Sequence, residues 1–152
     1  MTLRERIEID FKAAFKSSDK ARLSSLRLIK AALKNREIEK GGELSDEEVI
    51  EVLSTLAKQQ KESIVEFRKG GRTDLVRKEE AELGVIKEYL PEELPEEEID
   101  RIINECISEV SASSIRDMGR VMKVLMPRIK GRADGKVVNA KVREILQDKE
   151  RS

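Results

Sequence analysis

Apolar residues recur every three or four positions along almost the whole chain, which is the spacing of one face of an α-helix. The first such face consists of Leu3, Ile7, Phe11, Ala14 and Phe15. The last consists of Val137, Val138, Val142, Ile145 and Leu146. No segment of any length alternates apolar and polar residues as a half-buried strand does. Because aromatic residues make up only 3% of the chain, a core must consist mainly of aliphatic side chains, which favours helix-on-helix packing. The sequence therefore predicts an all-α fold.

Capping residues and glycines divide this pattern into separate helices. Ser18 or Asp19 can cap a helix that runs to about Lys40, where two glycines suit its C-terminus. Ser45 followed by Glu48 has the spacing of a capping box for the next helix. We expect about four helices before the segment YLPEELPEEEID and about three after it.

The segment YLPEELPEEEID, residues 89–100, is the strongest boundary in the chain. It holds Pro91 and Pro95, and a proline disfavours helical conformation in the residue before it. Pro95 also suits the first position of a new helix, whose dipole the following glutamates complement. We therefore expect two helical subdomains, a larger N-terminal lobe of residues 1–91 and a small C-terminal three-helix lobe of residues 92–152.

The apolar face of the segment IRDMGRVMKVLMPRIK has two unusual features. Pro127 lies three-quarters of the way along it, which predicts that the helix kinks or ends near Met126. Met118, Met122 and Met126 are spaced by four and share one helix face. We interpret this stripe as core, the alternative being an adaptable contact surface for a partner.

Residue types that carry covalent or metal chemistry are scarce. The single cysteine, Cys106, has no His to act as its base, and Glu105 and Glu109 would raise its pKa, so we interpret it as a core residue. One Cys and no His exclude a structural zinc site in practice. Paired carboxylates occur only in the Glu-rich linker and on exposed helix faces, where nothing apolar shifts their pKa. We expect no catalytic residue, no metal and no cofactor.

The segment GRADGKVV, residues 131–138, has only part of the pattern of a nucleotide-binding loop. Its glycines are one residue too close for a Walker-type loop, Val137 replaces the hydroxyl that would hold magnesium, and no strand precedes it. Gly131 is instead predicted to end a helix in the left-handed conformation. Asp134 is predicted to cap a helix that begins at Gly135. These three residues would shape a corner between two helices.

The balanced total of 31 basic and 31 acidic residues conceals a strong asymmetry. Eight acidic residues and one arginine lie between Pro91 and Val110. From Ile115 to Arg143, nine basic residues against two acidic ones leave a local excess of +7. This excess indicates a surface that contacts a phosphate backbone. The candidate RNA-binding residues are Arg116, Arg120, Lys123, Arg128, Lys130, Arg132 and Lys136.

Other interpretations of this basic surface stay open. It can be a solvated helix face, or it can pair with the acidic helix that precedes it. The absence of aromatic residues from this basic region argues against a platform that stacks single-stranded bases, and leaves recognition of the shape and backbone of a folded nucleic acid.

A second basic set lies in the N-terminal lobe. Glu37 and Glu39 adjoin it, so we favour an ordinary solvated helix face over a functional surface. Its members are Lys20, Arg22, Arg27, Lys30, Lys34 and Arg36.

The start of the chain, MTLRERIEIDFKAAF, lacks the continuous apolar region of a signal peptide. No stretch approaches the roughly 20 apolar residues of a transmembrane helix. A lone cysteine fits a reducing compartment. We expect a cytoplasmic protein that does not enter a membrane.

The stretch DMGRVMKVLMPRIKGRADGKVVNAKVREIL closely resembles the C-terminal signature of the GatB/YqeY family. The stretches RLSSLRLIKAALKNREIE, RKGGRTDLVRKEEAEL and YLPEELPEEEI resemble the free-standing YqeY proteins, so the resemblance spans essentially the whole chain. It implies an all-helical protein with two helical subdomains. A related module forms the tail of the B subunit of the tRNA-dependent amidotransferase and is appended to some glutaminyl-tRNA synthetases. There it acts as a tRNA-binding appendage.

The activity commonly attributed to the family is that of a carbon–nitrogen ligase with glutamine as amido-N-donor, inherited from the full enzyme. This chain has no candidate for the ammonia-producing or glutamyl-activating sites. The resemblance therefore implies a non-catalytic tRNA-binding protein, or an accessory of a tRNA-charging or amidotransferase enzyme. The alternative is a protein–protein adaptor whose basic patch binds an acidic partner.

Overall fold

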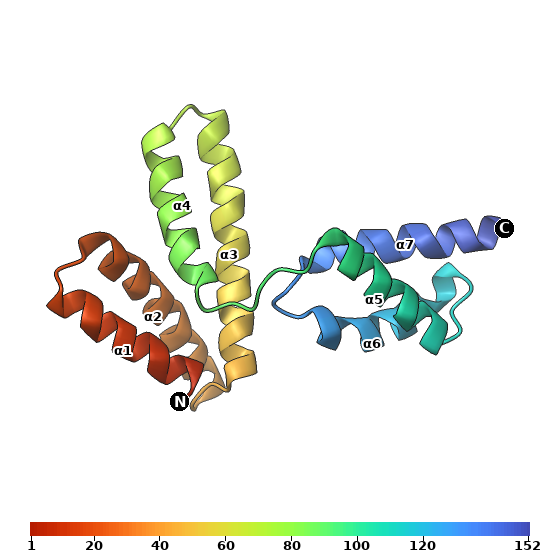
Figure 1. Cartoon of the computed structure of the whole chain (residues 1–152), viewed down its shortest axis with the longest axis horizontal. Coiled ribbons are helices and arrows are strands. Elements are labelled where there is room, and N and C mark those ends of the chain that lie inside the picture. Colours follow the sequence, from red (N-terminus) through yellow and green to blue (C-terminus); the bar gives the residue numbers. More distant parts are fainter. The chain divides into compact units, whose positions relative to one another are not determined.

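The computed structural model describes all 152 residues, Met1–Ser152, and contains helices and no strand (Figure 1). The elements are α1 (Leu3–Lys16), α2 (Lys20–Lys40), α3 (Asp46–Lys69), α4 (Thr73–Lys87), α5 (Glu96–Glu109), the 3-10 helix η1 (Ile115–Asp117), α6 (Met118–Ile129) and α7 (Gly135–Arg151). The predicted all-α class is confirmed. None of the helices is long and apolar enough to cross a membrane.

The chain divides into two compact units, Met1–Leu90 and Pro91–Ser152, which are called unit 1 and unit 2 below. Unit 1 contains α1 to α4, and unit 2 contains the remaining helices. That each unit folds as an independent domain stays a prediction.

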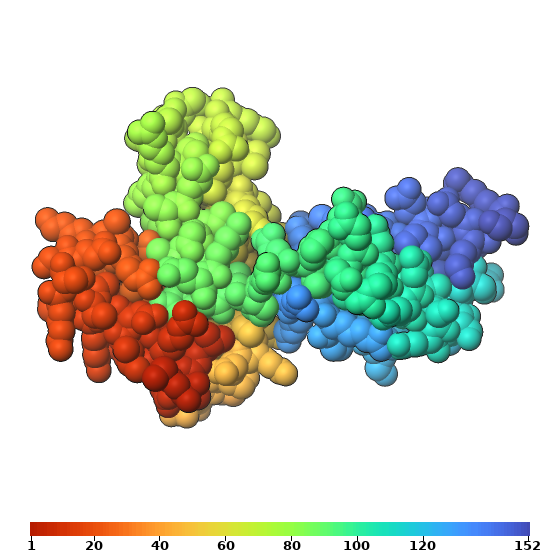
Figure 2. Space-filling view, in the orientation of Figure 1, coloured from red at the N-terminus to blue at the C-terminus, as the bar shows by residue number.

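Unit 1 is built from two helical hairpins, α1–α2 and α3–α4, and α2 packs against helices of both (Figure 1). The turn at the end of the α3–α4 hairpin projects from the rest of this unit (Figure 2). Its core consists of aliphatic side chains at helical spacing, and the fully buried ones include Ile7, Leu26, Ile29, Leu33, Val49, Leu53 and Ile86. Phe15, expected on the first apolar face, is 62% exposed, because α1 is near its end there and the core lies against Ile7 and Ala14.

The caps that the sequence indicated set the bounds of the helices in unit 1. Asp19 caps α2 by accepting a hydrogen bond from the backbone N–H of Arg22. Ser45 and Glu48 form the predicted capping box at the start of α3. Gly41 ends α2 with a φ of +78°, a left-handed conformation that favours glycine. These local predictions are confirmed.

Unit 2 packs α5, α6 and α7 around a second core. Buried residues recur every four positions on α6 and α7, so each helix presents one continuous apolar stripe. The fully buried residues are Ile103, Cys106, Val121, Leu125, Ile129, Val138, Val142 and Leu146. Cys106 is thus a core residue, as expected, and burial raises the pKa of its thiol.

The bounds of α5 and α6 differ from the sequence prediction. Pro95 is the N-cap of α5 rather than its first helical residue. Pro127 lies inside α6, which continues to Ile129 instead of ending near Met126. Pro127 removes only one backbone hydrogen bond, the one to the carbonyl of Lys123, and both residues are exposed, so water can replace it.

The methionine stripe of α6 is only partly core. Met118 and Met122 are partly buried against the core of unit 2. Met126 is 39% exposed. The interpretation as core therefore holds for the first two residues and is wrong for Met126, because α6 buries the neighbouring stripe of Val121, Leu125 and Ile129.

Candidate nucleic-acid interface

All seven candidate RNA-binding residues lie in unit 2, and all are exposed. Arg116 is in η1, Arg120, Lys123 and Arg128 are in α6, Lys130 and Arg132 are in the connection that follows, and Lys136 is in the first turn of α7. The candidates therefore all lie in successive elements of one short segment, residues 116–136.

The connection between α6 and α7 is a tight corner. Gly131 has a φ of +75°, where a side chain would be strained. The carboxylate of Asp134 accepts a hydrogen bond from the backbone N–H of Lys136 at 2.9 Å and caps α7, which begins at Gly135. The positive end of the α7 dipole and the Lys136 side chain therefore lie together at this corner.

Residues that precede α5 hold the corner in place. The backbone N–H of Leu94 donates to the carbonyl oxygen of Arg132 at 2.8 Å. The Nε of Arg132 donates to the carbonyl oxygen of Glu92 at 3.2 Å. The Arg132 side chain thus takes part in the internal structure of unit 2, which leaves it less available to a ligand.

The acidic helix α5 neutralises part of the basic surface. Arg128 pairs with Glu109 at 2.6 Å, and this contact lowers the pKa of the Glu109 carboxyl. Lys141, another of the nine basic residues between Ile115 and Arg143, pairs with Glu96 at 3.0 Å and with Asp100 at 2.9 Å. The interpretation in which the basic patch pairs with the preceding acidic helix therefore applies to these two bases. Lys130 is also engaged within the chain.

Asp117 organises the start of α6. Its carboxylate accepts hydrogen bonds from the backbone N–H of Ser113 at 2.8 Å and of Ser114 at 3.2 Å, and it pairs with Arg120 at 2.9 Å. The bond from Ser113, followed by that from Arg120, lowers the pKa of Asp117 to about 2. Arg120 is therefore partly engaged by its own helix.

The low pKa of Asp117 predicts a loss of stability in acid. The unfolded chain has an ordinary Asp pKa of about 4, so the carboxylate stabilises unit 2 above that pH and the contribution is lost as pH falls towards 2. The melting midpoint of Asp117→Asn should lie below that of the wild type at pH 7, and this difference should shrink between pH 4 and pH 2. Circular dichroism melts over this range measure it, with the exposed Asp148→Asn as the control. If the difference between the two melting midpoints stayed the same from pH 4 to pH 2, the charged carboxylate of Asp117 would not be what stabilises unit 2.

Three candidate bases, Arg116, Lys123 and Lys136, are exposed and form no ion pair. They are called the unit 2 bases below. Arg116 lies in η1, which precedes α6, Lys123 lies in the middle of α6, and Lys136 lies in the first turn of α7, which follows it. None of their side chains pairs with an acidic side chain, which distinguishes them from Arg120 and Arg128.

Two apolar side chains are exposed in the same region. For Met126 the sequence offered this only as the alternative to a core position, and for Val137 it did not indicate it. Met126 is 39% exposed, and Val137, which was expected on the apolar face of α7, is 50% exposed. A Cβ added to Gly135 would lie 3.6 Å from the Cε of Met126, so Met126 contacts the first turn of α7. The α7 core follows Val138, Val142 and Leu146, and Val137 lies about 100° away from that stripe.

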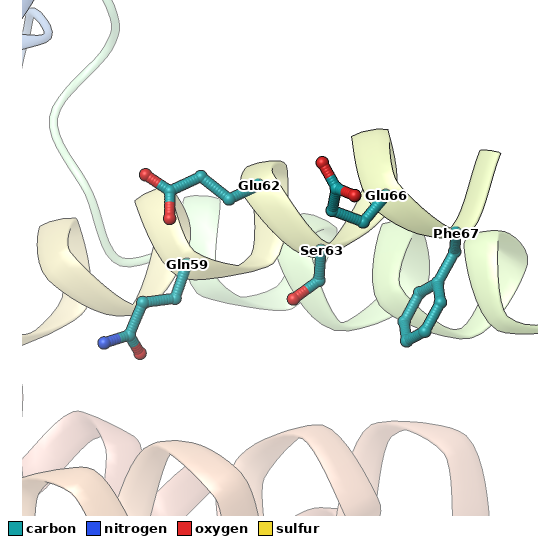
Figure 3. A pocket seen from close by; sticks show the side chains of 5 residues that line it. All are labelled: Gln59, Glu62, Ser63, Glu66 and Phe67. Carbon is teal, nitrogen blue, oxygen red and sulfur yellow. The ribbon is translucent and has the colours of Figure 1, made fainter. Parts of the chain in front are cut away.

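A hollow lies elsewhere, on α3 of unit 1 (Figure 3). Its lining consists of Gln59, Glu62, Ser63, Glu66 and Phe67, all from this one helix. Gln59, Ser63 and Phe67 point to one side in Figure 3, and the two glutamates lie along the other edge. No group of three or more His, Cys, Asp or Glu side chains is arranged to hold a metal ion.

Comparison with known proteins relates nearly the whole chain to one family. The family model described as Yqey-like protein matches residues 4–146. Three similar relatives bear the same name, "Altered inheritance of mitochondria protein 41, mitochondrial". The relative from Pyrenophora tritici-repentis is 33% identical over 93% of this chain and 79% of its own length.

The relative from Lachancea thermotolerans is 38% identical over 69% of this chain and 58% of its own length. The relative from Saccharomyces cerevisiae is 32% identical over 87% of this chain and 63% of its own length. The chain thus spans less than two thirds of these two relatives. Because all three are named as mitochondrial proteins, the expectation of a cytoplasmic location is contradicted.

Proposed function

Because this chain belongs to the YqeY-like protein family, we propose that it is a non-catalytic tRNA-binding protein, or an accessory of a tRNA-charging or amidotransferase enzyme, that contacts the RNA backbone. The observation that carries the proposal is the set of unit 2 bases, which are exposed and unpaired in a segment with a local excess of +7. Carbon–nitrogen ligase activity with glutamine as donor belongs in this proposal to the full enzyme and not to this chain.

Contacts from these bases to phosphates would supply affinity without reading sequence. Each phosphate that a Lys or Arg neutralises releases condensed counterions, which makes binding depend steeply on salt. Unit 2 contains no aromatic residue, so stacking on exposed bases is not available to it. A folded RNA, whose backbone presents a defined shape, is therefore the ligand that suits this surface best.

The unpaired bases should contribute more than the paired ones. A phosphate that approaches Arg128 must compete with Glu109, which already lies 2.6 Å from it. Arg116, Lys123 and Lys136 have no such competitor. Lys136 lies in the first turn of α7, whose N-terminus the Asp134 carboxylate already caps, so the Lys136 side chain itself would make the phosphate contact.

Replacing the three unit 2 bases tests this proposal. The variant Arg116→Gln, Lys123→Gln and Lys136→Gln should bind folded bulk tRNA more weakly, and the slope of log K against log salt should fall in magnitude by about 2 to 3. Fluorescence anisotropy at several salt concentrations measures both quantities.

The matched control removes three exposed bases of α4, as Arg77→Gln, Lys78→Gln and Lys87→Gln, and is called the α4 control. It carries the same change in net charge and should bind almost as the wild type does. Equal tRNA binding by the unit 2 variant and the α4 control would show that unit 2 is not the RNA surface.

The exposed Met126 and Val137 favour a second candidate function, an adaptor that binds an acidic protein. Exposed apolar side chains suit a protein interface better than a phosphate backbone. A complex that forms from cell extract, survives nuclease digestion and is lost in Met126→Ser with Val137→Ser would favour the adaptor.

A further inference from the structure

Helix α2 of unit 1 carries a second concentration of positive charge. Between Lys20 and Arg36 there are six basic residues and no acidic one. The structure separates these six bases into two groups. Three of them form ion pairs with acidic side chains: Arg22 with Glu88 at 2.6 Å, Lys30 with Glu8 at 3.0 Å and Arg36 with Glu39 at 3.9 Å.

The other three, Lys20, Arg27 and Lys34, are exposed and form no ion pair. They are called the α2 bases below. Successive members are seven residues apart, so they lie within about 20° of one another around the helix and about 10 Å apart along it. This line is opposite the face that carries Ile29, which is fully buried in the core. The first turns of α2, in orange, reach the surface of unit 1 in Figure 2.

The acidic residues in α2 and directly before it do not neutralise this line. Glu37 pairs with Arg4 of α1 at 2.9 Å, and Glu39 pairs with Arg36 at 3.9 Å. Asp19 caps the start of α2 through its side chain. Each of these acidic residues is thus engaged elsewhere. The expectation of an ordinary solvated helix face, in which acidic residues neutralise the bases, therefore applies only to the three paired bases of α2.

The side chains that lie between the α2 bases are small. Ser24 and Ala31 lie between them on the same side of the helix, and both are exposed. Small side chains at these positions allow an extended ligand to approach along the helix. The evenly spaced charges of one sign suit a polymer with regularly spaced anions. A lipid surface fits less well, because Leu26, Ile29 and Leu33 of α2 are buried in unit 1 and Ile38 is the one large apolar residue of α2 that is exposed.

We propose that α2 is a second RNA-binding surface, on which Lys20, Arg27 and Lys34 contact phosphates of a folded RNA. The proposal rests on the proposed function for its ligand, and adds a site on unit 1 to the one on unit 2. When one RNA contacts both surfaces, each adds its own release of counterions, and the connection between the units raises the effective concentration of the second contact.

The α2 variant Lys20→Gln, Arg27→Gln and Lys34→Gln tests the proposal in the full chain. Gln keeps the helix propensity of Lys and Arg, so α2 should stay folded, and circular dichroism checks this. Affinity for folded bulk tRNA at about 0.1 M salt should fall at least about tenfold, and the salt slope should fall in magnitude by about 2 to 3. The α4 control removes the same charge from the same unit and should change little.

The outcomes separate this proposal from the proposed function. If the α2 variant binds tRNA as the α4 control does while the unit 2 variant is impaired, the second surface is refuted and the proposed function stands. If the wild type does not bind tRNA, both fail. If a polyglutamate of matched charge binds as tightly as tRNA and is lost equally in the α2 variant, the surface recognises an acidic protein and the assignment to RNA is overturned.

Discussion

A variant that lacks both the α2 bases and the unit 2 bases should lose nearly all affinity for folded tRNA at physiological salt. Six phosphate contacts account for about three orders of magnitude in affinity between roughly 50 and 200 mM salt. The two sets lie on different helices and share no partner, so their losses should add as free energies. Fluorescence anisotropy over a range of salt concentrations measures the wild type, the two triple variants and the combined variant.

The salt slope gives the sharpest comparison among these proteins. At about 0.9 per contact, the wild type should show a slope of magnitude about 5, each triple variant about half of it, and the combined variant a value near zero. Thermal melts should stay close to that of the wild type, because all six side chains are exposed. A combined variant that keeps most of the wild-type slope would assign binding to the paired bases, such as Arg120 and Arg128.

The second large effect concerns the core of unit 2. Leu125 is fully buried on α6, between Val121 and Ile129. Leu125→Ala should cost about 2 to 5 kcal/mol, because it removes apolar contacts and leaves a cavity. A unit of this size, residues 91–152, has a total stability of only about 3 to 9 kcal/mol. The substitution should therefore remove about half of the stability of unit 2 and move its unfolding transition to clearly lower urea.

Urea titration followed by circular dichroism measures this loss. If the two units are independent domains, unit 1 should keep its own transition in Leu125→Ala while that of unit 2 moves to lower urea. Met126→Ala is the matched control, since Met126 is adjacent but 39% exposed, and it should cost well under the Leu125 value. A single transition that moves as a whole would contradict the division into two domains.

The helices could be predicted from the sequence because the signals that define them are local. Apolar spacing identifies the buried face of each helix, and Asp19, Ser45 and Gly41 act within one turn of themselves. Pro127 shows the limit of such signals. A proline inside a helix removes one backbone hydrogen bond, but the position at which the helix ends depends also on the packing of Ile129 into the core of unit 2.

Side-chain exposure at the edge of an apolar face also depends on the neighbouring helices. Phe15 and Val137 have the spacing of core residues, yet they are 62% and 50% exposed. Each lies near a helix end, where no neighbouring helix covers that side. The spacing of apolar residues predicts which face of a helix is buried, but packing against neighbouring helices decides how far the burial extends around the helix.

The division of the bases into paired and unpaired groups could not be predicted, because the partners are distant in the chain. Arg128 meets Glu109 across α5 and α6, and Lys141 meets Asp100 across α5 and α7. The same holds in unit 1, where Glu37 pairs with Arg4 rather than with its neighbours on α2. The local charge excess locates a basic region, and tertiary structure decides which of its members can bind a ligand.

The most direct test of the central proposal is a titration of the wild-type chain with folded bulk tRNA from about 50 to 200 mM salt. Contacts from the unit 2 bases and the α2 bases predict saturable binding and a linear plot of log K against log salt with a slope of magnitude about 5. Absence of binding at the lowest salt, or a slope below about 1, would contradict the account.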